Sequence, residues 1–193
     1  MRQQAGYATL LLLFITLSVS ANHVDEYIQN YKDIAQREMQ RSDIPASIIL
    51  AQSIHESAWG KGELAVESKN HFGIKCKDYW QGPTYYIEDD DYINGQLIKS
   101  CFRSYEGVES SYIDHTDFLL ESERYLSLFN YDKTDYKNWA KGLKKCGYAT
   151  DPNYAAKLIR IIETHQLYIF DEINERPIAM EAPKFFIPAQ FLK

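Results

Sequence analysis

The residues best suited to chemistry are carboxylates, one at the end of an apolar run and several together further along the chain. Glu56 lies in the segment SIILAQSIHESAWG (residues 47–60), and residues 88–91 read Glu-Asp-Asp-Asp. Hydrolysis of a glycosidic bond normally uses two carboxyl groups that flank the bond, one as general acid and the other as base or nucleophile. This pattern is compatible with glycosidase chemistry.

Glu56 is expected at the C-terminal end of a buried helix, where unsatisfied carbonyl groups carry partial negative charge. That charge, together with desolvation beside Trp59, favours the neutral carboxylic acid and raises its pKa. A group that keeps its proton near neutral pH can act as a general acid. Gln52 or Ser53, on the same side of the helix, could orient it. Alternatively, Glu56 points into water or pairs with Lys61.

The second carboxylate has its candidates in the acidic run, which contains Glu88, Asp89, Asp90 and Asp91. Such a run is also typical of a solvated strand edge or of a weak, non-specific cation site. Sugars bind on aromatic platforms, for which Trp59, Trp80, Tyr85 and Tyr148 are available. Each of these rings, taken alone, could equally be a packing residue.

Apolar periodicity predicts a mostly helical domain that positions these groups. A helix ending near Ser57 has apolar residues all round its axis, which predicts a buried central helix, with Ser42 or Asp43 as its cap. Further helices are predicted at 24–41, 110–128, 136–145 and from Asp151 onward. Between them, Asn94-Gly95 separates two β-prone runs and predicts a hairpin. The fold class is therefore α+β, mostly helical, with a small β-hairpin lobe.

The chain begins with the pattern of a secretory leader. An apolar run covers Ala8–Val19, and small residues then allow cleavage after Ala21. The alternative is an uncleaved anchor, but the run is shorter than the roughly 20 residues that span a bilayer. The predicted organisation is a signal peptide at 1–21, one domain at 22–171 and an extended or partly disordered tail at 172–193.

Composition narrows the classes of partner. The 193-residue chain has a formal net charge of −6 and no block of basic residues, which argues against nucleic acid. No pair of cysteines or histidines has metal-ligand spacing, so we expect neither metal nor cofactor. Of the three cysteines, Cys76 and Cys101 flank the hairpin segment and are predicted to form a disulfide, which leaves Cys146 unpaired.

Three blocks of the sequence resemble glycoside hydrolase family 73, the bacterial endo-β-N-acetylglucosaminidases of the flagellar-muramidase and autolysin type. They are AQSIHESAWGKGELAVESKNHFGIK, CFRSYEGVESSYIDHTDFL and KKCGYATDPNYAAKLI, in the family's order, and the similarity covers residues 28–170. The resemblance implies a lysozyme-like fold, peptidoglycan as substrate and cleavage at N-acetylglucosamine.

The resemblance also suggests roles for individual residues. It makes Glu56 the general acid, Glu88 the second carboxylate and Tyr148 a tyrosine of the active site. Trp59 and Phe72 are expected to shape the cleft. Because this hairpin is unusually acidic, Asp89 or Asp90 could take the role of Glu88, and with Trp80 they complete the predicted substrate-binding set.

The resemblance leaves alternatives of different kinds. A lytic transglycosylase or an N-acetylmuramidase shares the lysozyme-like fold, and a transglycosylase needs only one acid/base group. A non-catalytic relative could keep the cleft and bind glycan strands. In each case we expect an exported monomer, periplasmic or secreted, with no stable membrane span after cleavage of the leader.

Overall fold

The computed structural model describes the backbone of residues 5–93 and 95–172 and the side chains of residues 23–89 and 95–172. In chain order the elements are α1 (Ala5–Ser42), α2 (Ala46–Glu56), α3 (Glu63–Ser68), β1 (Thr84–Ile93), β2 (Gln96–Arg103), α4 (Val108–Glu121), η1 (Glu123–Asn130), α5 (Tyr136–Lys145), α6 (Tyr154–Thr164) and η2 (Leu167–Phe170). The architecture is the predicted one, mostly helical with a small β-hairpin.

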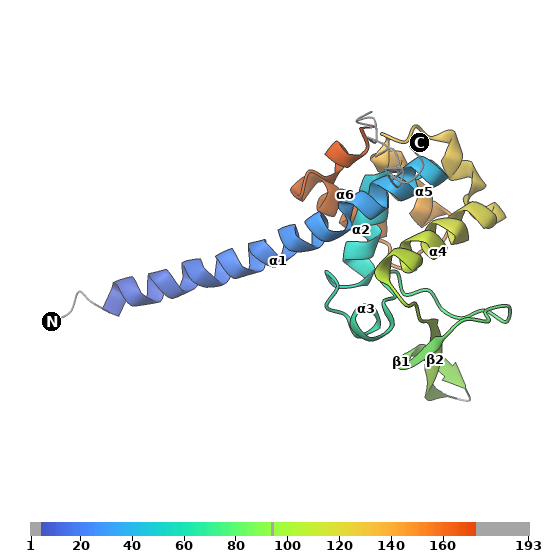
Figure 1. Ribbon diagram of the computed structural model, residues 1–193, viewed down its shortest axis with the longest axis horizontal. Coiled ribbons are helices and arrows are strands. Elements are labelled where there is room, and N and C mark those ends of the chain that lie inside the picture. The colour runs from blue at the N-terminus through green and yellow to red at the C-terminus, as the bar shows by residue number, and fades with distance from the viewer. Residues whose placement is uncertain (1–4, 94, 173–193) are drawn as a thin grey trace, which may run out of the picture.

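Figure 1 shows two parts that meet below α4. The helices α1, α2 and α4 to α6 form the main body, here called the helical lobe, whereas residues 70–105 form the hairpin lobe on one side of it. The first half of α1 projects from the body, and its second half packs against α2 and α4. Within the described residues, no helix is both long and apolar enough to cross a membrane.

The structure does not test the predicted leader or the predicted tail. Cleavage after Ala21 would fall inside α1, where no side chain before residue 23 is described, so it stays a prediction. The predicted tail lies outside the described residues from residue 173 onward.

The central helix α2 is enclosed on all sides. Every residue from Ala46 to Ile54 is buried, and the helix contacts α1, α5, α6 and η2. The apolar residues of α2 lie all round its axis, so burial against each of these neighbours is favourable. The prediction of a buried central helix is confirmed.

The N-terminus of α2 is satisfied from the far end of the chain rather than by a local cap. The Asp171 carboxylate accepts hydrogen bonds from the Ser47 backbone N–H at 2.7 Å and from its hydroxyl at 2.6 Å. The cap predicted at Ser42 or Asp43 is wrong, because the Ser42 hydroxyl donates back to the Glu38 carbonyl and Pro45 takes the N-cap position. A negative charge at this end suits the helix dipole.

The hairpin lobe is built on one antiparallel pair. In β1 and β2 the pairing is regular from Thr84 opposite Arg103 to Glu88 opposite Lys99, and it then shifts before Tyr92. β1 ends at Ile93 and β2 begins at Gln96, so the turn lies at the predicted position. The acidic run therefore begins where the regular register ends.

The chain leaves α2 through a tight left-handed turn. Ala58, Trp59 and Gly60 have φ values of 49°, 60° and 73° in succession. The Trp59 N–H donates to the Ile54 carbonyl at 3.1 Å, and the Gly60 N–H donates to the Ser57 hydroxyl at 2.8 Å. These bonds satisfy groups at the end of the helix and reverse the chain immediately after Glu56.

Replacing Gly60 by alanine should destabilise this turn. A Cβ there would come within 2.9 Å of the Tyr27 ring, in addition to the positive φ. Gly73→Ala is a matched control, since its φ is also positive, at 63°, but no atom lies within 4 Å of the added Cβ. The left-handed conformation costs about 1–2 kcal/mol for an L residue, so both variants should lose stability. Gly60→Ala should lose clearly more in urea unfolding, and equal losses would refute the role of the Tyr27 contact.

Candidate active site

Glu56 opens into a cleft of about 310 Å³ between the two lobes. The described lining residues are Glu56, Phe72, Gly73, Ile74, Lys75, Lys77, Arg103, Phe118, Arg124, Tyr125, Tyr148 and Ala149. The segment 72–77 comes from the hairpin lobe, whereas most of the aromatic rings come from the helical lobe. Glu56 is the only acid in this described lining, so the cleft presents one carboxylate to whatever it binds.

The Glu56 carboxylate is held by a tyrosine that is itself held by an amide. The Tyr154 hydroxyl donates to Glu56 Oε1 at 3.1 Å, and Gln52 Nε2 donates to the Tyr154 hydroxyl at 3.0 Å. The prediction that Gln52 orients the acid is thus met through an intermediate. Ser53 has a different partner, because its hydroxyl accepts a hydrogen bond from Tyr112 at 2.9 Å.

The surroundings of Glu56 favour its protonated form. Part of the side chain is open to solvent in the cleft, but the protein atoms around it desolvate the carboxylate and raise its pKa. The Tyr154 hydrogen bond and the charge of Lys157 act in the opposite direction and limit the rise. The result is an acid with a raised pKa and an open face toward the cleft.

Tyr148 lies beside Glu56 in the cleft. Its ring stacks on that of Tyr154, with the centroids 5.5 Å apart and the planes 23° from parallel. Burial and the nearby Glu56 charge raise the pKa of Tyr148 well above its usual value, so the hydroxyl keeps its proton. In the part of the chain described here the Tyr148 hydroxyl makes no hydrogen bond, and it can donate to a ligand.

Phe72 reaches the cleft through a turn organised by Asn70. The Asn70 amide donates to the carbonyls of Ile74 and Arg103, while its oxygen accepts from the N–H groups of Phe72 and Ile74. Phe72 also stacks on the buried ring of His115, with the centroids 3.9 Å apart. The predicted position of Phe72 in the cleft wall agrees with this placement.

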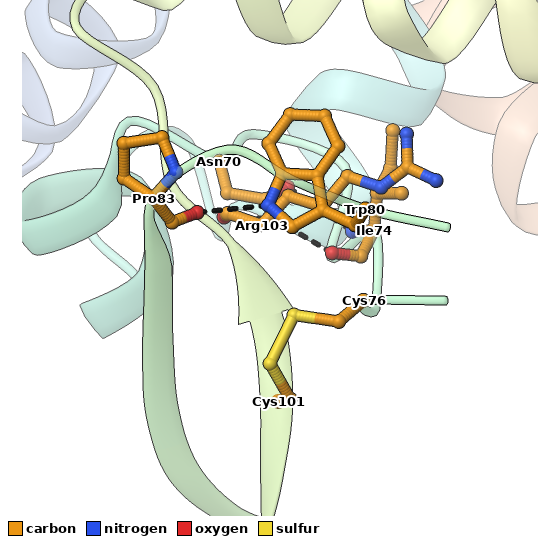
Figure 2. Close-up of a disulfide and its surroundings, with 7 residues drawn as sticks. All are labelled: Asn70, Ile74, Cys76, Trp80, Pro83, Cys101 and Arg103. Carbon is orange, nitrogen blue, oxygen red and sulfur yellow. Dashed lines mark hydrogen bonds between the residues drawn. A yellow bond between two sulfur atoms is a disulfide. The ribbon is translucent and has the colours of Figure 1, made fainter. Parts of the chain in front are cut away.

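The lining segment 72–77, here called the lip of the cleft, is linked covalently to β2 of the hairpin by the predicted disulfide. Figure 2 shows the bond between Cys76 and Cys101, whose Cα atoms are 5.3 Å apart. Beside it, the Cys76 N–H donates to the Cys101 carbonyl, and the Arg103 N–H donates to the Ile74 carbonyl. Cys146 is a free thiol. The segment that carries Lys75 is therefore fixed along β2.

Trp80 packs outside the lining of the cleft. Its indole N–H donates to the Pro83 carbonyl at 2.9 Å, and its ring lies under the Arg103 guanidinium at 4.6 Å (Figure 2). Arg103 is nearly buried, pairs with Asp114 at 2.6 Å and lines the cleft itself. Trp80 thus supports Arg103, and its predicted contact with substrate stays a prediction.

Trp59 is also turned away from the cleft. Its ring packs edge-on against Tyr27 and against His165, at centroid distances of 6.4 Å and 5.1 Å. The left-handed backbone after Glu56 sends this side chain toward α1 and α6. The structure thus places Trp59 behind the turn, packed against α1 and the end of α6, and outside the described lining of the cleft.

The acids of the hairpin differ in their relation to the cleft. Glu88 is exposed, lies opposite Lys99 in the regular part of the sheet and does not line the cleft. Asp89 forms an ion pair with Lys75, a residue of the cleft lining, at 2.9 Å. The side chains of Asp90 and Asp91 lie outside the described residues.

Several residues of the site were not singled out from the sequence. The sequence pattern places Tyr154 in a helix and gives it no role in the site, although it stands six residues after Tyr148 in the same block and begins α6. The cations of the lining give no signal in sequence because they are scattered over three segments, with Lys75 and Lys77 in one and Arg103 and Arg124 in two others. Only the fold brings them together.

Comparisons with known proteins agree with this arrangement. A family model described as mannosyl-glycoprotein endo-beta-N-acetylglucosaminidase (Glucosaminidase) matches residues 32–167. The chain is 32% identical over 150 residues to the peptidoglycan hydrolase FlgJ of Pseudomonas aeruginosa, covering 75% of this chain and 37% of FlgJ. It is also 32% identical over 177 residues to the exo-glucosaminidase LytG of Bacillus subtilis, covering 86% of this chain and 61% of LytG.

The fold is also that of a solved glycoside hydrolase domain. The truncated domain from Salmonella typhimurium FlgJ matches with a TM-score of 0.61 and 31% identity, over 74% of this chain and 97% of that domain. This likeness supports the α+β, lysozyme-like fold expected from the sequence. The chain spans less than two thirds of the length of the FlgJ and LytG relatives. On the extent of the family match, the chain belongs to the glucosaminidase family, glycoside hydrolase family 73.

Proposed function

We propose that this protein is a peptidoglycan hydrolase that cuts the glycan strand at β-1,4-linked N-acetylglucosamine. The observation that carries the proposal is Glu56, an acid with a raised pKa that is mounted on a buried helix and opens into a cleft between two lobes. Membership of the glucosaminidase family and the similarity to a peptidoglycan hydrolase and an exo-glucosaminidase support the choice of substrate.

In this proposal Glu56 gives its proton to the glycosidic oxygen as the bond breaks. Tyr154 and Gln52 hold the carboxyl group in one orientation, so that little reorganisation is needed during the reaction. The free hydroxyl of Tyr148 donates to the sugar beside the bond, and the Phe72 ring offers it an apolar face. No metal or cofactor has a part in these steps.

The second carboxylate is proposed to come from residues 89–91 rather than from Glu88. Glu88 sits in the regular part of the sheet and away from the cleft lining, whereas Asp89 contacts Lys75 at the lip of the cleft. The regular register ends at Glu88, so residues 89–91 begin the irregular part of the strand pairing. A carboxylate from this segment would activate water or attack the sugar directly.

Action on the cell wall requires export, which the predicted leader would provide. We propose that the chain is exported, that the leader is removed after Ala21, and that the mature protein acts as a monomer in the periplasm or outside the cell. The similarity to peptidoglycan hydrolases and to an autolysin of Enterococcus faecalis supports action outside the cytoplasm.

One observation favours a second candidate. Because Glu56 is the only acid in the described lining, the cleft also suits a lytic transglycosylase, which uses a single acid/base group. In that reaction the muramic acid sugar closes on itself, and the acidic hairpin would be a bystander. The products of the two reactions differ, so one digestion distinguishes them.

Digestion of purified peptidoglycan, followed by borohydride reduction and mass spectrometry, tests the proposal. The wild-type protein should produce reduced N-acetylglucosamine ends. Glu56→Gln keeps the shape but removes the proton, and its rate should fall by roughly 10²–10⁴-fold, as for other lost general acids. Glu67→Gln, an exposed acid of α3, should cleave at the wild-type rate.

Other products would decide against the proposal. Anhydromuramic ends would make the protein a transglycosylase, and reduced muramic acid ends would make it a muramidase. A folded wild-type protein that produces no new ends would leave a non-catalytic glycan-binding protein. Wild-type activity in Glu56→Gln would overturn the assignment of the acid.

Four matched variants show which hairpin carboxylate acts in catalysis: Glu88→Gln, Asp89→Asn, Asp90→Asn and Asp91→Asn. We expect Glu88→Gln to remain near the wild-type rate. At least one variant in 89–91 should lose roughly 100-fold or more in kcat while remaining folded, because a base or nucleophile is lost. If Glu88→Gln shows the largest loss, the second carboxylate is Glu88 and the argument from register fails.

Tyr154→Phe should move the pH profile of the enzyme. The hydrogen bond from Tyr154 lowers the pKa of Glu56, so its removal raises that pKa. A general acid works only while protonated, and the alkaline limb of kcat/KM should therefore shift to higher pH. Tyr112→Phe is the control, since it also loses a buried hydrogen bond, to Ser53, but does not contact Glu56. Its alkaline limb should not move, and an unshifted limb in Tyr154→Phe would contradict the arrangement.

A further inference from the structure

The described lining of the cleft concentrates positive charge in a protein that is acidic as a whole. It contains Lys75, Lys77, Arg103 and Arg124 but only one acid, Glu56. The formal net charge of the chain is −6. Uncharged sugars give no reason for such a concentration of cations, so the lining points to a ligand that also carries negative charge.

Two of these cations are paired within the protein. Lys75 forms its ion pair with Asp89 at 2.9 Å. Arg103 pairs with Asp114 at 2.6 Å and donates a hydrogen bond to Tyr79, which fixes it within the wall. Their charges are largely balanced by the protein.

Arg124 is held in place without a carboxylate partner in the described part of the chain. Its guanidinium lies over the Tyr125 ring, 4.7 Å from the centroid. Nη2 donates to the Gly147 carbonyl at 3.1 Å and to the Tyr125 hydroxyl. These bonds use only one nitrogen, which leaves Nη1 and Nε of the planar fork to bind a carboxylate. The Arg124 side chain is thus exposed, its guanidinium group is held in one orientation, and its positive charge has no acidic partner among the described residues.

Lys77 supplies the matching charge from the other lobe. It is exposed and follows Cys76, whose disulfide to β2 fixes the lip of the cleft. Among the residues described, no acid pairs with its ammonium group. Each lobe therefore contributes one cation without an acidic partner among the described residues to the lining that also contains Glu56.

We propose that Lys77 and Arg124 bind free carboxylates of the peptide stems attached to the glycan strand, so that the enzyme prefers stem-bearing strands to bare ones. The inference rests on the proposed function. In peptidoglycan every second sugar can carry a peptide with free carboxylates, so such groups flank any bond that lies over Glu56. A ligand in the cleft would place these carboxylates near both lobes.

Binding to insoluble peptidoglycan tests this without relying on catalysis. We would use the full chain carrying Glu56→Gln and measure co-sedimentation with two preparations. Both are treated with hydrofluoric acid, which removes phosphate polymers, and one is then capped at its carboxyl groups with ethanolamine. Stems occupy the lactyl groups in this material, so the free carboxylates come from the peptides.

Capping should weaken binding by roughly 10-fold or more at moderate salt, because two charge-assisted contacts are lost. On the uncapped material Lys77→Gln and Arg124→Gln should each weaken binding by roughly 3- to 10-fold. This loss lies between the value expected for an exposed ion pair and that for a hydrogen bond to a charged group. On the capped material neither should differ from the parent. Lys141→Gln, an exposed cation of α5 outside the lining, should match the parent on both.

Two results would overturn the inference. One is equal binding of the parent protein to capped and uncapped material. The other is the same loss in the variants on both preparations, which would indicate a general structural effect. The proposed function fails separately, when the wild-type protein produces no N-acetylglucosamine ends. Binding that depends on carboxylates would still be observed in that case.

Discussion

The structure depends on the burial of α2 along its length from Ala46 to Ile54. A helix surrounded by α1, α5, α6 and η2 cannot turn or slide without breaking apolar contacts on every side, so the position of its last residue is fixed. Asp171 anchors the other end through two hydrogen bonds to Ser47. Because Asp171 is itself buried, its pKa rises to about 6, and the ionised form is held at neutral pH by those bonds and the helix dipole. The end of the domain thus secures the beginning of the helix that carries Glu56.

This burial also sets the electrostatics of the acid. Protein atoms around Glu56 raise its pKa, whereas Tyr154 and Lys157 lower it. A fully enclosed carboxyl group would keep its proton but could not reach a substrate, and a fully solvated one would lose it at neutral pH. The left-handed turn at residues 58–60 ends the helix directly after Glu56 and leaves the carboxyl group at the boundary between these two environments.

Sequence reasoning succeeded where a pattern is local or repeated. The apolar residues round the axis of α2 predicted its burial, and the hairpin and the partners of Cys76 followed from turn chemistry and spacing. It failed where a side chain's direction depends on packing. Trp59 stands three residues after Glu56 but is directed away by consecutive positive φ values. Tyr154 reaches Glu56 across 98 positions of sequence, a contact that no periodicity encodes.

The distribution of charge in the cleft reconciles two opposing requirements. A cation close to Glu56 would stabilise its carboxylate, lower its pKa and remove the proton that a general acid needs. An anionic polymer, however, is best attracted by cations. Among the described charged groups, it is Lys157 that lowers the pKa of Glu56, and it does not belong to the described lining of the cleft. Lys77 and Arg124 line the cleft from opposite lobes, and neither is among the groups that shift the pKa of Glu56. In the proposed function, cations on both lobes would therefore attract negative charge without cancelling the rise in the pKa of Glu56.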